Sequence, residues 1–83
     1  MSAMSSEIDL RGMDAVEAVC VLDRYLDEAL RSNLKSARII HGKGTGTLRA
    51  AVQQDLRKNK FVKSFRLGVY GEGEDGVTIA EFG

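Results

Sequence analysis

The sequence predicts an α/β sandwich, in which a four-stranded mixed sheet carries two helices on one of its faces. Three observations predict this fold. Two segments repeat apolar residues at steps of three and four, which is typical of helices that bury one side. Four short segments are apolar or alternate apolar with polar residues, as half-buried strands do. These segments follow one another in the order β-α-β-α-β-β, and 83 residues suffice for one such domain.

The first half of the domain contains a strand and a long helix. The strand covers residues 7–11, where polar and apolar residues alternate until Gly12. Asp14 stands three residues before Glu17, a variant of the capping box, so a helix should begin there. Its apolar face runs to about residue 32, and Asn33 is suited to a left-handed cap. The residues of that face are Ala15, Val19, Leu22, Leu26 and Ala29.

The second half contains three strands and a shorter helix. Strands are expected at 37–40, 62–67 and 77–82, with a glycine-rich loop at 70–76. The shorter helix follows the glycines at 42–46 and ends near residue 59. The first two strands should be parallel, joined by a right-handed crossover, and the last two should form an antiparallel hairpin. Two helices cannot cover both faces of such a sheet, so the other face is predicted to be free for a partner.

The domain is expected to span residues 7–83. Residues 1–6 (Met-Ser-Ala-Met-Ser-Ser) show neither a strand nor a helix pattern and are expected to be a disordered linker or an expression remnant. They lack the regions of a signal peptide, and no apolar run reaches the length of a membrane span. We therefore expect a cytoplasmic piece of a longer protein, with no membrane partner.

The cysteine content and the charge pattern limit the function further. Cys20 is the only cysteine, which excludes an internal disulfide and a four-cysteine zinc site, and it is expected to be a small packing residue. The net charge is zero, yet residues 35–66 carry nine Lys and Arg against one acid, between acidic segments at 14–28 and 72–81. This pattern indicates one positive face for a polyanion. The alternative is that the charges interleave in space on an ordinary solvated surface.

The strand at 37–40 leads into a glycine-rich turn that carries one lysine and precedes a helix. Such a turn predicts a phosphate site, because glycines let backbone N–H groups approach an anion and a helix N-terminus favours negative charge. The spacing fits neither the P-loop nor the dinucleotide-binding fingerprint. We expect the phosphate or nucleic acid to be bound by Gly42, Lys43, Gly44, Thr45, Gly46, Arg49 and Arg38.

A second group of polar residues should meet this turn. Parallel strands that precede helices end at the same edge of a sheet, so Asp9 and Arg11 are expected to lie near His41. In this hypothesis Arg11 and Lys43 hold the phosphate, and His41 acts as general acid or base. Asp9 orients His41, pairs with Arg11, or binds a divalent ion such as Mg²⁺ or Mn²⁺; one carboxylate is a poor magnesium site, so a metal stays open. The alternatives are that Asp9 and Arg11 only set their turn, and that His41 only caps the glycines.

Two motifs together resemble the small MutS-related (Smr) domain family. They are Ile8-Asp9-Leu10-Arg11-Gly12 and His41-Gly42-Lys43-Gly44-Thr45-Gly46, and the resemblance covers residues 7–82. They are most similar to the version at the C-terminus of the second class of bacterial MutS proteins. The resemblance implies a fold like the C-terminal domain of translation initiation factor three. It also implies nucleic-acid binding, with nicking endonuclease activity in several members. For such an activity, the hypothesis above makes Asp9, Arg11 and His41 the expected catalytic residues.

The resemblance further implies a parent protein with a MutS-like ATPase, expected to be a homodimer that acts on recombination intermediates or stalled ribosomes. The isolated domain is expected to be monomeric, with DNA, RNA or the ribosome as partner. Two other functions stay open. One is a non-catalytic module that binds DNA or ribosomal RNA. The other is binding of a mononucleotide or another small phosphate.

Overall fold

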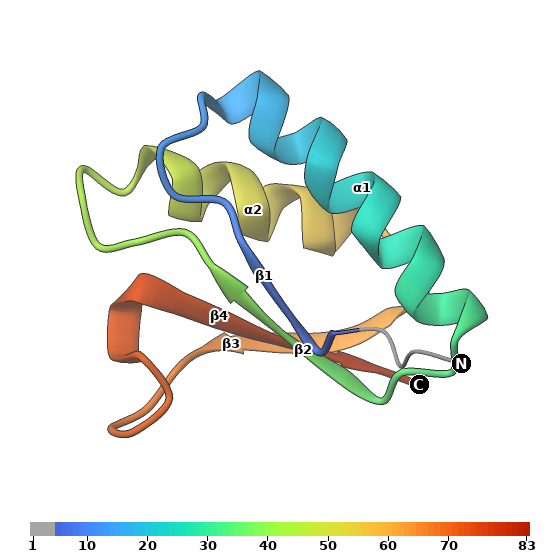
Figure 1. The fold of residues 1–83 in the computed structure, drawn as a ribbon. Coiled ribbons are helices and arrows are strands. Elements are labelled where there is room, and N and C mark those ends of the chain that lie inside the picture. Colours follow the sequence, from blue (N-terminus) through green and yellow to red (C-terminus); the bar gives the residue numbers. More distant parts are fainter. Residues whose placement is uncertain (1–4) are drawn as a thin grey trace.

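The computed structural model describes residues 5–83 and confirms the predicted fold class. Within these residues, two helices lie side by side on one face of a four-stranded mixed sheet (Figure 1). The elements are β1 (Glu7–Asp9), α1 (Ala15–Arg31), β2 (Ser36–Ile40), α2 (Thr47–Lys58), β3 (Val62–Leu67), the 3₁₀ turn η1 (Glu74–Gly76) and β4 (Val77–Phe82).

The first strand is shorter than expected. β1 ends at Asp9, two residues before the predicted end of the first strand. Residues 1–4 of the expected linker lie outside the described residues. The carbonyl of Ser6, which precedes β1, accepts a hydrogen bond from the backbone N–H of Arg38 at 2.8 Å.

The strand order in the sheet is β1-β2-β4-β3. β1 and β2 are parallel, as the crossover through α1 requires, whereas β4 runs antiparallel to both of its neighbours. The antiparallel hairpin of β3 and β4 is therefore confirmed. In the parallel pair Asp9 lies opposite Ile40, so the segments that follow β1 and β2 leave the sheet at the same edge.

Both ends of α1 follow the local signals in the sequence. The carboxylate of Asp14 accepts the backbone N–H of Glu17 at 2.8 Å and satisfies one of the free donors of the first turn. At the other end Asn33 has a φ of 58°, and the N–H of Leu34 reaches back to the carbonyl of Ala29 at 3.0 Å. This is the Schellman arrangement, which satisfies the last carbonyls of a helix.

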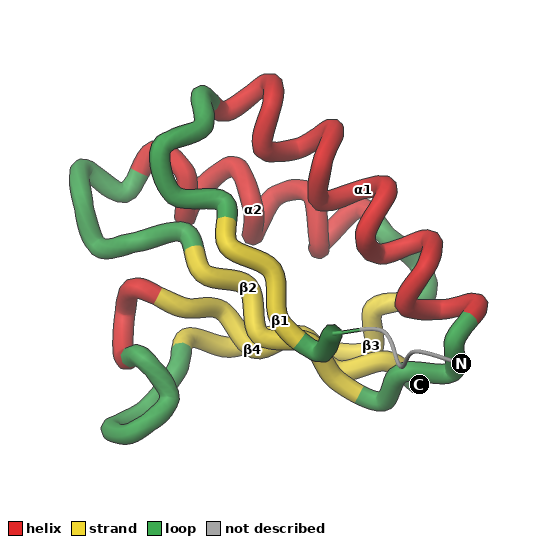
Figure 2. The backbone as a smooth tube through the Cα atoms, in the orientation of Figure 1, coloured by secondary structure: helices red, strands yellow, loops and turns green. Residues whose placement is uncertain are grey.

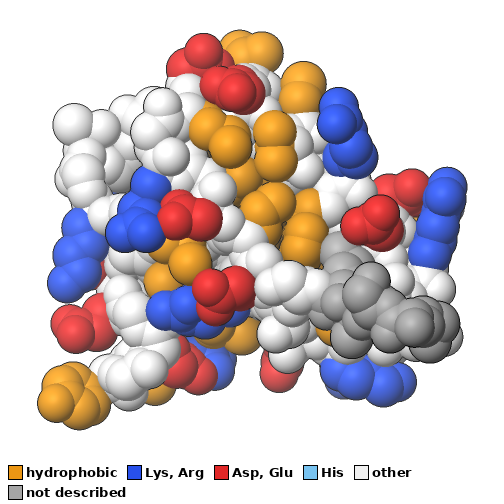
Figure 3. All heavy atoms as spheres, viewed as in Figure 1, with side chains coloured by type: hydrophobic (Ala, Val, Ile, Leu, Met, Phe, Trp, Pro, Cys, Tyr) orange, Lys and Arg blue, Asp and Glu red, His pale blue; other side chains and the backbone are white. Residues whose placement is uncertain are grey.

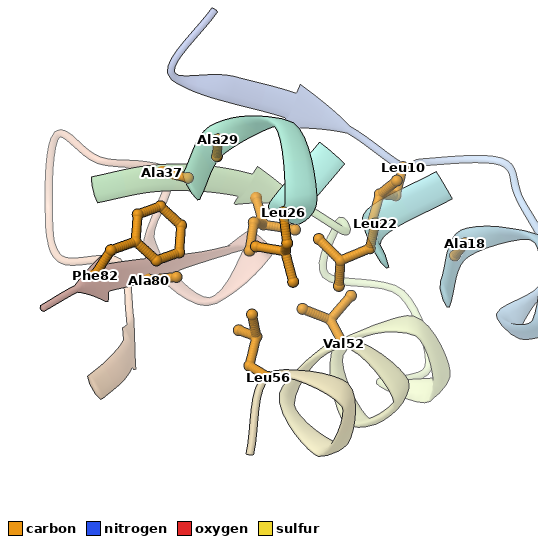
Figure 4. Packing of buried hydrophobic residues seen from close by; sticks show 11 residues of the cluster. Leu10, Ala18, Leu22, Leu26, Ala29, Ala37, Val52, Leu56, Ala80 and Phe82 are labelled. Carbon is orange, nitrogen blue, oxygen red and sulfur yellow. The ribbon is translucent and has the colours of Figure 1, made fainter. Parts of the chain in front are cut away.

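The core lies between the helices and the sheet (Figure 4). α1 buries a stripe that differs from the predicted one in its first turns, because Ala18 is buried whereas Ala15 and Val19 are only half-buried. Each fully buried leucine stabilises the fold by about 1.5–3 kcal/mol. The largest fully buried side chains are Leu10, Leu22, Leu26, Ile39, Val52, Leu56 and Thr78.

Cys20 is exposed, so the prediction that it is a packing residue is wrong. The reason is angular: successive helix residues turn by about 100°, and position 20 therefore lies well away from the buried position of Ala18. Cys20 borders a shallow groove of about 370 Å³ between α1 and α2, which Val16 and Asp55 also line. Within residues 5–83 no helix is long and apolar enough to cross a membrane.

The charges are partly interleaved rather than gathered on one face. Arg38 pairs with Glu7 at 2.9 Å, Arg66 with Glu72 at 2.7 Å, and Lys43 lies 3.6 Å from Asp75. Figure 3 shows acidic and basic side chains next to each other on the face that it presents. The acidic flanks therefore neutralise part of the basic middle. Six of the nine basic residues in the middle segment 35–66 have no acidic partner among the described residues: Lys35, Arg49, Arg57, Lys58, Lys60 and Lys63.

Candidate phosphate-binding and active site

The two sequence motifs meet at one edge of the sheet. The turns from β1 to α1 and from β2 to α2 leave the sheet at the same end (Figures 1 and 2). Gly42 has a φ of +86°, and a Cβ added to it would lie 3.3 Å from Cγ of Arg11. Only glycine combines this left-handed backbone with so close a neighbour. Arg11 therefore lies against the glycine turn, as the sequence predicts.

Asp9 and Arg11 form a two-point ion pair. Nε of Arg11 donates to Oδ1 of Asp9 at 3.0 Å, and Nη2 donates to Oδ2 at 2.7 Å. The backbone N–H of Arg11 also donates to Oδ1, at 3.0 Å. The hydrogen bonds from the guanidinium lower the pKa of Asp9 to about 2 and raise the pKa of Arg11. Asp9 is thus an exposed, fully ionised carboxylate at neutral pH.

His41 is buried and uses both of its ring nitrogens. Nδ1 lies 2.9 Å from the carbonyl of Gly42, which can only accept, so Nδ1 carries the proton. Nε2 then accepts a hydrogen bond from the hydroxyl of Thr78 at 2.8 Å, and Gln53 donates to that hydroxyl at 3.4 Å. Burial lowers the pKa of His41, against the effect of the Gly42 carbonyl, which raises it. The neutral ring therefore braces the start of the glycine turn.

This geometry bears on the roles open for Asp9. Among the described residues, both ring nitrogens of His41 bond to Gly42 and Thr78 and neither bonds to Asp9, so it is Gly42 and Thr78 that orient the imidazole. Of the roles expected for Asp9, the structure contains the ion pair with Arg11. Within residues 5–83 no three His, Cys, Asp or Glu side chains gather as a metal site.

The glycine turn is anchored on one side and open on the other. The backbone N–H groups of His41 and Gly42 both donate to the carbonyl of Gly76, at 3.1 and 2.9 Å. The next four N–H groups, from residue 43 to residue 46, have no acceptor within residues 5–83. These residues border a hollow of about 260 Å³, which we call the phosphate hollow. Its lining is Met13, Ala15 and residues 41–49.

The start of α2 completes the phosphate hollow. Gly46 is the N-cap, with a φ of 87°, and no side chain caps this helix. Thr45 and Thr47 instead bond to each other through their hydroxyls, at 2.9 Å. A Cβ added to Gly46 would lie 3.0 Å from Nη2 of Arg49, so the guanidinium lies over the turn. The hollow thus combines the positive end of a helix with one arginine.

The remaining predicted site residues lie at the rim or elsewhere. Lys43 shares the rim with two acids, at 3.8 Å from Glu74 and 3.6 Å from Asp75. Arg38 lies on the sheet face opposite the helices, because its neighbours Ala37 and Ile39 are buried against them. There Nε of Arg38 donates to the backbone carbonyl of Glu72 at 2.9 Å. The structure therefore does not bring Arg38 to the phosphate hollow.

Sequence reasoning missed the residues outside the two motifs that support His41, which are Thr78 of β4, Gln53 of α2 and Gly76 of η1. Thr78, Gln53 and Gly76 are far from His41 in the chain, and none belongs to either motif. One signal was available for Thr78. It alternates with Ala80 and Phe82 on the buried face of the last strand, and a fully buried hydroxyl needs a hydrogen-bond partner.

Comparison with known proteins adds a family to this geometry. The family model described as the Smr domain matches residues 8–83. The chain is 53% identical over 81 residues to Endonuclease MutS2 of Clostridium beijerinckii, and 58% identical over 78 residues to that of Ruminiclostridium cellulolyticum. These matches cover 98% and 94% of the chain but only 10% of each relative, so the chain spans about a tenth of their length.

Two solved structures are similar to this one. The crystal structure of the Smr domain of Thermus thermophilus MutS2 covers 95% of the chain, with 99% of its own length matched, at 43% identity and a TM-score of 0.91. YdaL, a stand-alone small MutS-related protein from Escherichia coli, covers 93% of the chain, with 63% of its own length matched. It has 20% identity and a TM-score of 0.88, a likeness of fold alone. The chain belongs to the Smr domain family.

Proposed function

We propose that this domain binds a nucleic acid through a backbone phosphate in the phosphate hollow and nicks the strand by hydrolysing the phosphodiester bond. The observation that carries the proposal is the meeting of the Asp9–Arg11 pair with Gly42, beside four backbone N–H groups that have no partner in the described chain. Relatives ten times longer are named endonucleases, which supports the same activity here.

Binding follows from the donors of the hollow. Phosphate oxygens accept hydrogen bonds from backbone N–H groups of residues 43–46 and from Arg49, and the positive end of α2 favours their charge. The free Nη1 of Arg11 supplies a further donor from the opposite side of Gly42. Nζ of Lys43 lies 3.6 Å from Oδ1 of Asp75, which is a long ion pair. When Lys43 moves away from Asp75, its ammonium group adds a positive charge to the hollow.

The chemical step uses Asp9 as the base. A water molecule gives a proton to the carboxylate, its oxygen bonds to phosphorus, and the bond from phosphorus to the leaving sugar oxygen breaks. The leaving oxygen takes a proton from solvent, so a hydroxyl end and a phosphate end result. When Arg11 turns from Asp9 to the phosphate, the carboxylate loses the partner that lowers its pKa and becomes a stronger base.

For His41 the contacts favour a positioning role. Transfer of a proton by its ring would require breaking the hydrogen bond to Gly42 or to Thr78. The bond from Nδ1 to the Gly42 carbonyl instead fixes the first residue of the turn that binds the phosphate. A His41→Gln variant should therefore weaken binding and cleavage together, whereas Asp9→Asn should remove cleavage and leave binding in place.

A nicking assay on supercoiled plasmid tests the proposal, run with and without a chelator. Asp9→Asn should lower the nicking rate by at least about 100-fold, the range of a general base, with an unchanged circular dichroism spectrum. Nicking by a folded Asp9→Asn variant at the wild-type rate would rule out Asp9 as the base. Matched RNA oligonucleotides identify the nucleophile, because a 2′,3′-cyclic phosphate product would mean attack by the substrate 2′-hydroxyl.

A second function, a non-catalytic module for DNA or ribosomal RNA, is favoured by one observation. Both candidate proton-transfer groups are occupied, Asp9 by Arg11 and His41 by Gly42 and Thr78. This module would bind oligonucleotides with a steep salt dependence and give no nicks. In either case we place the domain in a larger MutS-like ATPase that acts on recombination intermediates or stalled ribosomes.

A further inference from the structure

A second cationic surface lies at the far end of α2 from the phosphate hollow. Four basic residues with no acidic partner in the described chain are concentrated where α2 ends and β3 begins: Arg57, Lys58, Lys60 and Lys63. They occur within seven consecutive positions of the chain, together with Phe61. These residues do not line the phosphate hollow.

Aromatic rings lie among these cations. The ammonium of Lys60 lies 5.4 Å from the ring centre of Phe61, and the guanidinium of Arg57 lies 5.5 Å from that of Phe65. Phe65 packs against the core and holds Arg57 in place, whereas Phe61 is 57% exposed. Exposed rings among lysines and arginines are what proteins use to stack bases and bind phosphates of unpaired strands.

One side of α2 connects the two surfaces. Arg49, Gln53 and Arg57 follow at four-residue steps and therefore share one side of the helix. Arg49 lies over Gly46 in the hollow, Gln53 reaches Thr78 of β4, and Arg57 reaches Phe65 of β3. Next to this side runs β3, the edge strand of the sheet. We call the surface formed by Arg49, Gln53, Arg57, Lys60, Phe61 and Lys63 the α2 track.

We infer that the α2 track binds an unpaired strand of DNA or RNA that continues from the phosphate hollow. α2 has 12 residues, a length of about 18 Å. At a stacked spacing of about 3.4 Å per nucleotide this length corresponds to about five nucleotides. The cations contact the phosphates and Phe61 stacks on a base. A duplex would not offer its base faces to Phe61, so the substrate of the proposed nicking activity, on which this inference rests, is unpaired on this side.

The test measures binding of oligothymidylate and oligouridylate by fluorescence anisotropy, at lengths from about two to about ten nucleotides. Wild-type affinity should rise up to about five nucleotides and then level off, and a blunt duplex of equal length should bind more weakly. The two homopolymers show whether DNA or RNA is preferred. Equal affinity for single strand and duplex, or no dependence on length, would overturn the inference.

Variants locate the effect on the track. Phe61→Leu should lose about tenfold in affinity for strands longer than about five nucleotides and nothing for a dinucleotide. Lys60→Gln combined with Lys63→Gln should reduce the slope of log affinity against log salt by about 1.4. The matched controls are Tyr70→Leu, which removes another exposed ring, and Arg24→Gln, which removes an exposed charge from α1. Equal losses in the controls would contradict the track.

The outcomes separate this inference from the proposed function. If Asp9→Asn removes nicking while Phe61→Leu binds long strands as the wild type does, the track is wrong and the nuclease proposal stands. If Asp9→Asn nicks normally while the length dependence and the Phe61 effect hold, the nuclease proposal is wrong and the track is a binding surface.

Discussion

Among single residues, Thr78 completes the hydrogen bonding of the imidazole beside the candidate site. The Gly42 carbonyl can only accept, so it fixes the tautomer in which Nδ1 carries the proton, and the Thr78 hydroxyl then donates its one proton to Nε2. This arrangement holds a titratable ring neutral in a buried position, where burial lowers its pKa. The site therefore depends on a strand residue that touches no substrate.

We predict that Thr78→Val destabilises the domain by about 1–3 kcal/mol, because a side chain of the same shape leaves Nε2 of His41 buried without a donor. Urea unfolding followed by circular dichroism measures this change. The control is Thr45→Val, since the Thr45 hydroxyl is exposed. An unchanged midpoint in Thr78→Val would show that the hydroxyl does not support the ring.

At the scale of elements, the end of α1 depends on one backbone conformation. Asn33 has a φ of 58°, in the left-handed region, where a side chain other than Asn or Asp is strained by about 1–2 kcal/mol. We predict that Asn33→Ala lowers the melting temperature by about 4–8 °C per kcal/mol lost, and that Asn33→Gly keeps or raises it. Thermal unfolding of both variants measures the difference, and equal melting temperatures would contradict the strain.

The contact between the two helices contains a carboxyl group with an unusual pKa. Burial, and then the neighbouring carboxyl group of Asp23 in α1, raise the pKa of Asp55 from 3.8 to about 7, although Lys58 lowers it. Oδ2 of Asp55 is buried with no partner in the described chain. Between about pH 4 and pH 7 the folded state therefore holds a proton that the unfolded chain releases. Because of this proton, the contribution of Asp55 to the free energy of unfolding falls as the pH rises through that range.

We predict that Asp55→Asn removes this loss. Urea unfolding at about pH 5 and about pH 8 measures the free energy of unfolding of both proteins. The value for the wild type, taken relative to that of the variant, should be lower at about pH 8 than at about pH 5. The control is Asp27→Asn, which changes an exposed carboxylate that pairs with Arg31. In the Asp55→Asn variant, the free energy of unfolding should instead rise with pH near about pH 6, because the folded state disfavours protonation of His41 and lowers its pKa. A parallel pH dependence of wild type and Asp55→Asn would contradict the shifted pKa.

At the scale of the molecule, zero net charge conceals cations that are free to bind a polyanion. Three basic residues of the middle segment pair with acids, and six have no acidic partner within residues 5–83. We predict that affinity for a single strand falls as salt rises, with a log–log slope between about −2 and −4, since each contacted phosphate contributes about −0.7. Titrations from about 50 to 200 mM salt measure it. A slope near zero would show that these cations do not contact phosphates.

Much of the fold could be predicted from the sequence, because its signals are local. Asp14 lies three residues from Glu17, and Asn33 directly follows the C-cap residue Ser32, so both caps could be predicted from nearby residues. The meeting of Arg11 with Gly42 also followed, since parallel strands end at one edge. Each of these predictions needed only short spacings or one topological rule.

The rest of the site depends on contacts between distant parts of the chain. Glu7 and Arg38 are 31 residues apart, and Thr78 and His41 are 37 apart. No periodicity in the sequence specifies these partners. The sequence predicts Arg38 at the phosphate site, yet alternation along β2 turns it to the opposite face. The prediction for Cys20 is wrong for a similar reason, since a shift of two residues around α1, from Ala18 to Cys20, exchanges a buried position for an exposed one.

The bond from the glycine turn to Gly76 has a consequence for how the protein is made. The phosphate-binding turn is complete in sequence by residue 46, but its first two N–H groups require the carbonyl at residue 76. The strand that follows, β4, lies in the middle of the sheet, between β2 and β3. On the ribosome, therefore, β3 has no neighbour and the turn has no anchor until residues 76–82 have emerged. A nascent chain therefore carries every residue of the hollow before the glycine turn has its anchor at Gly76.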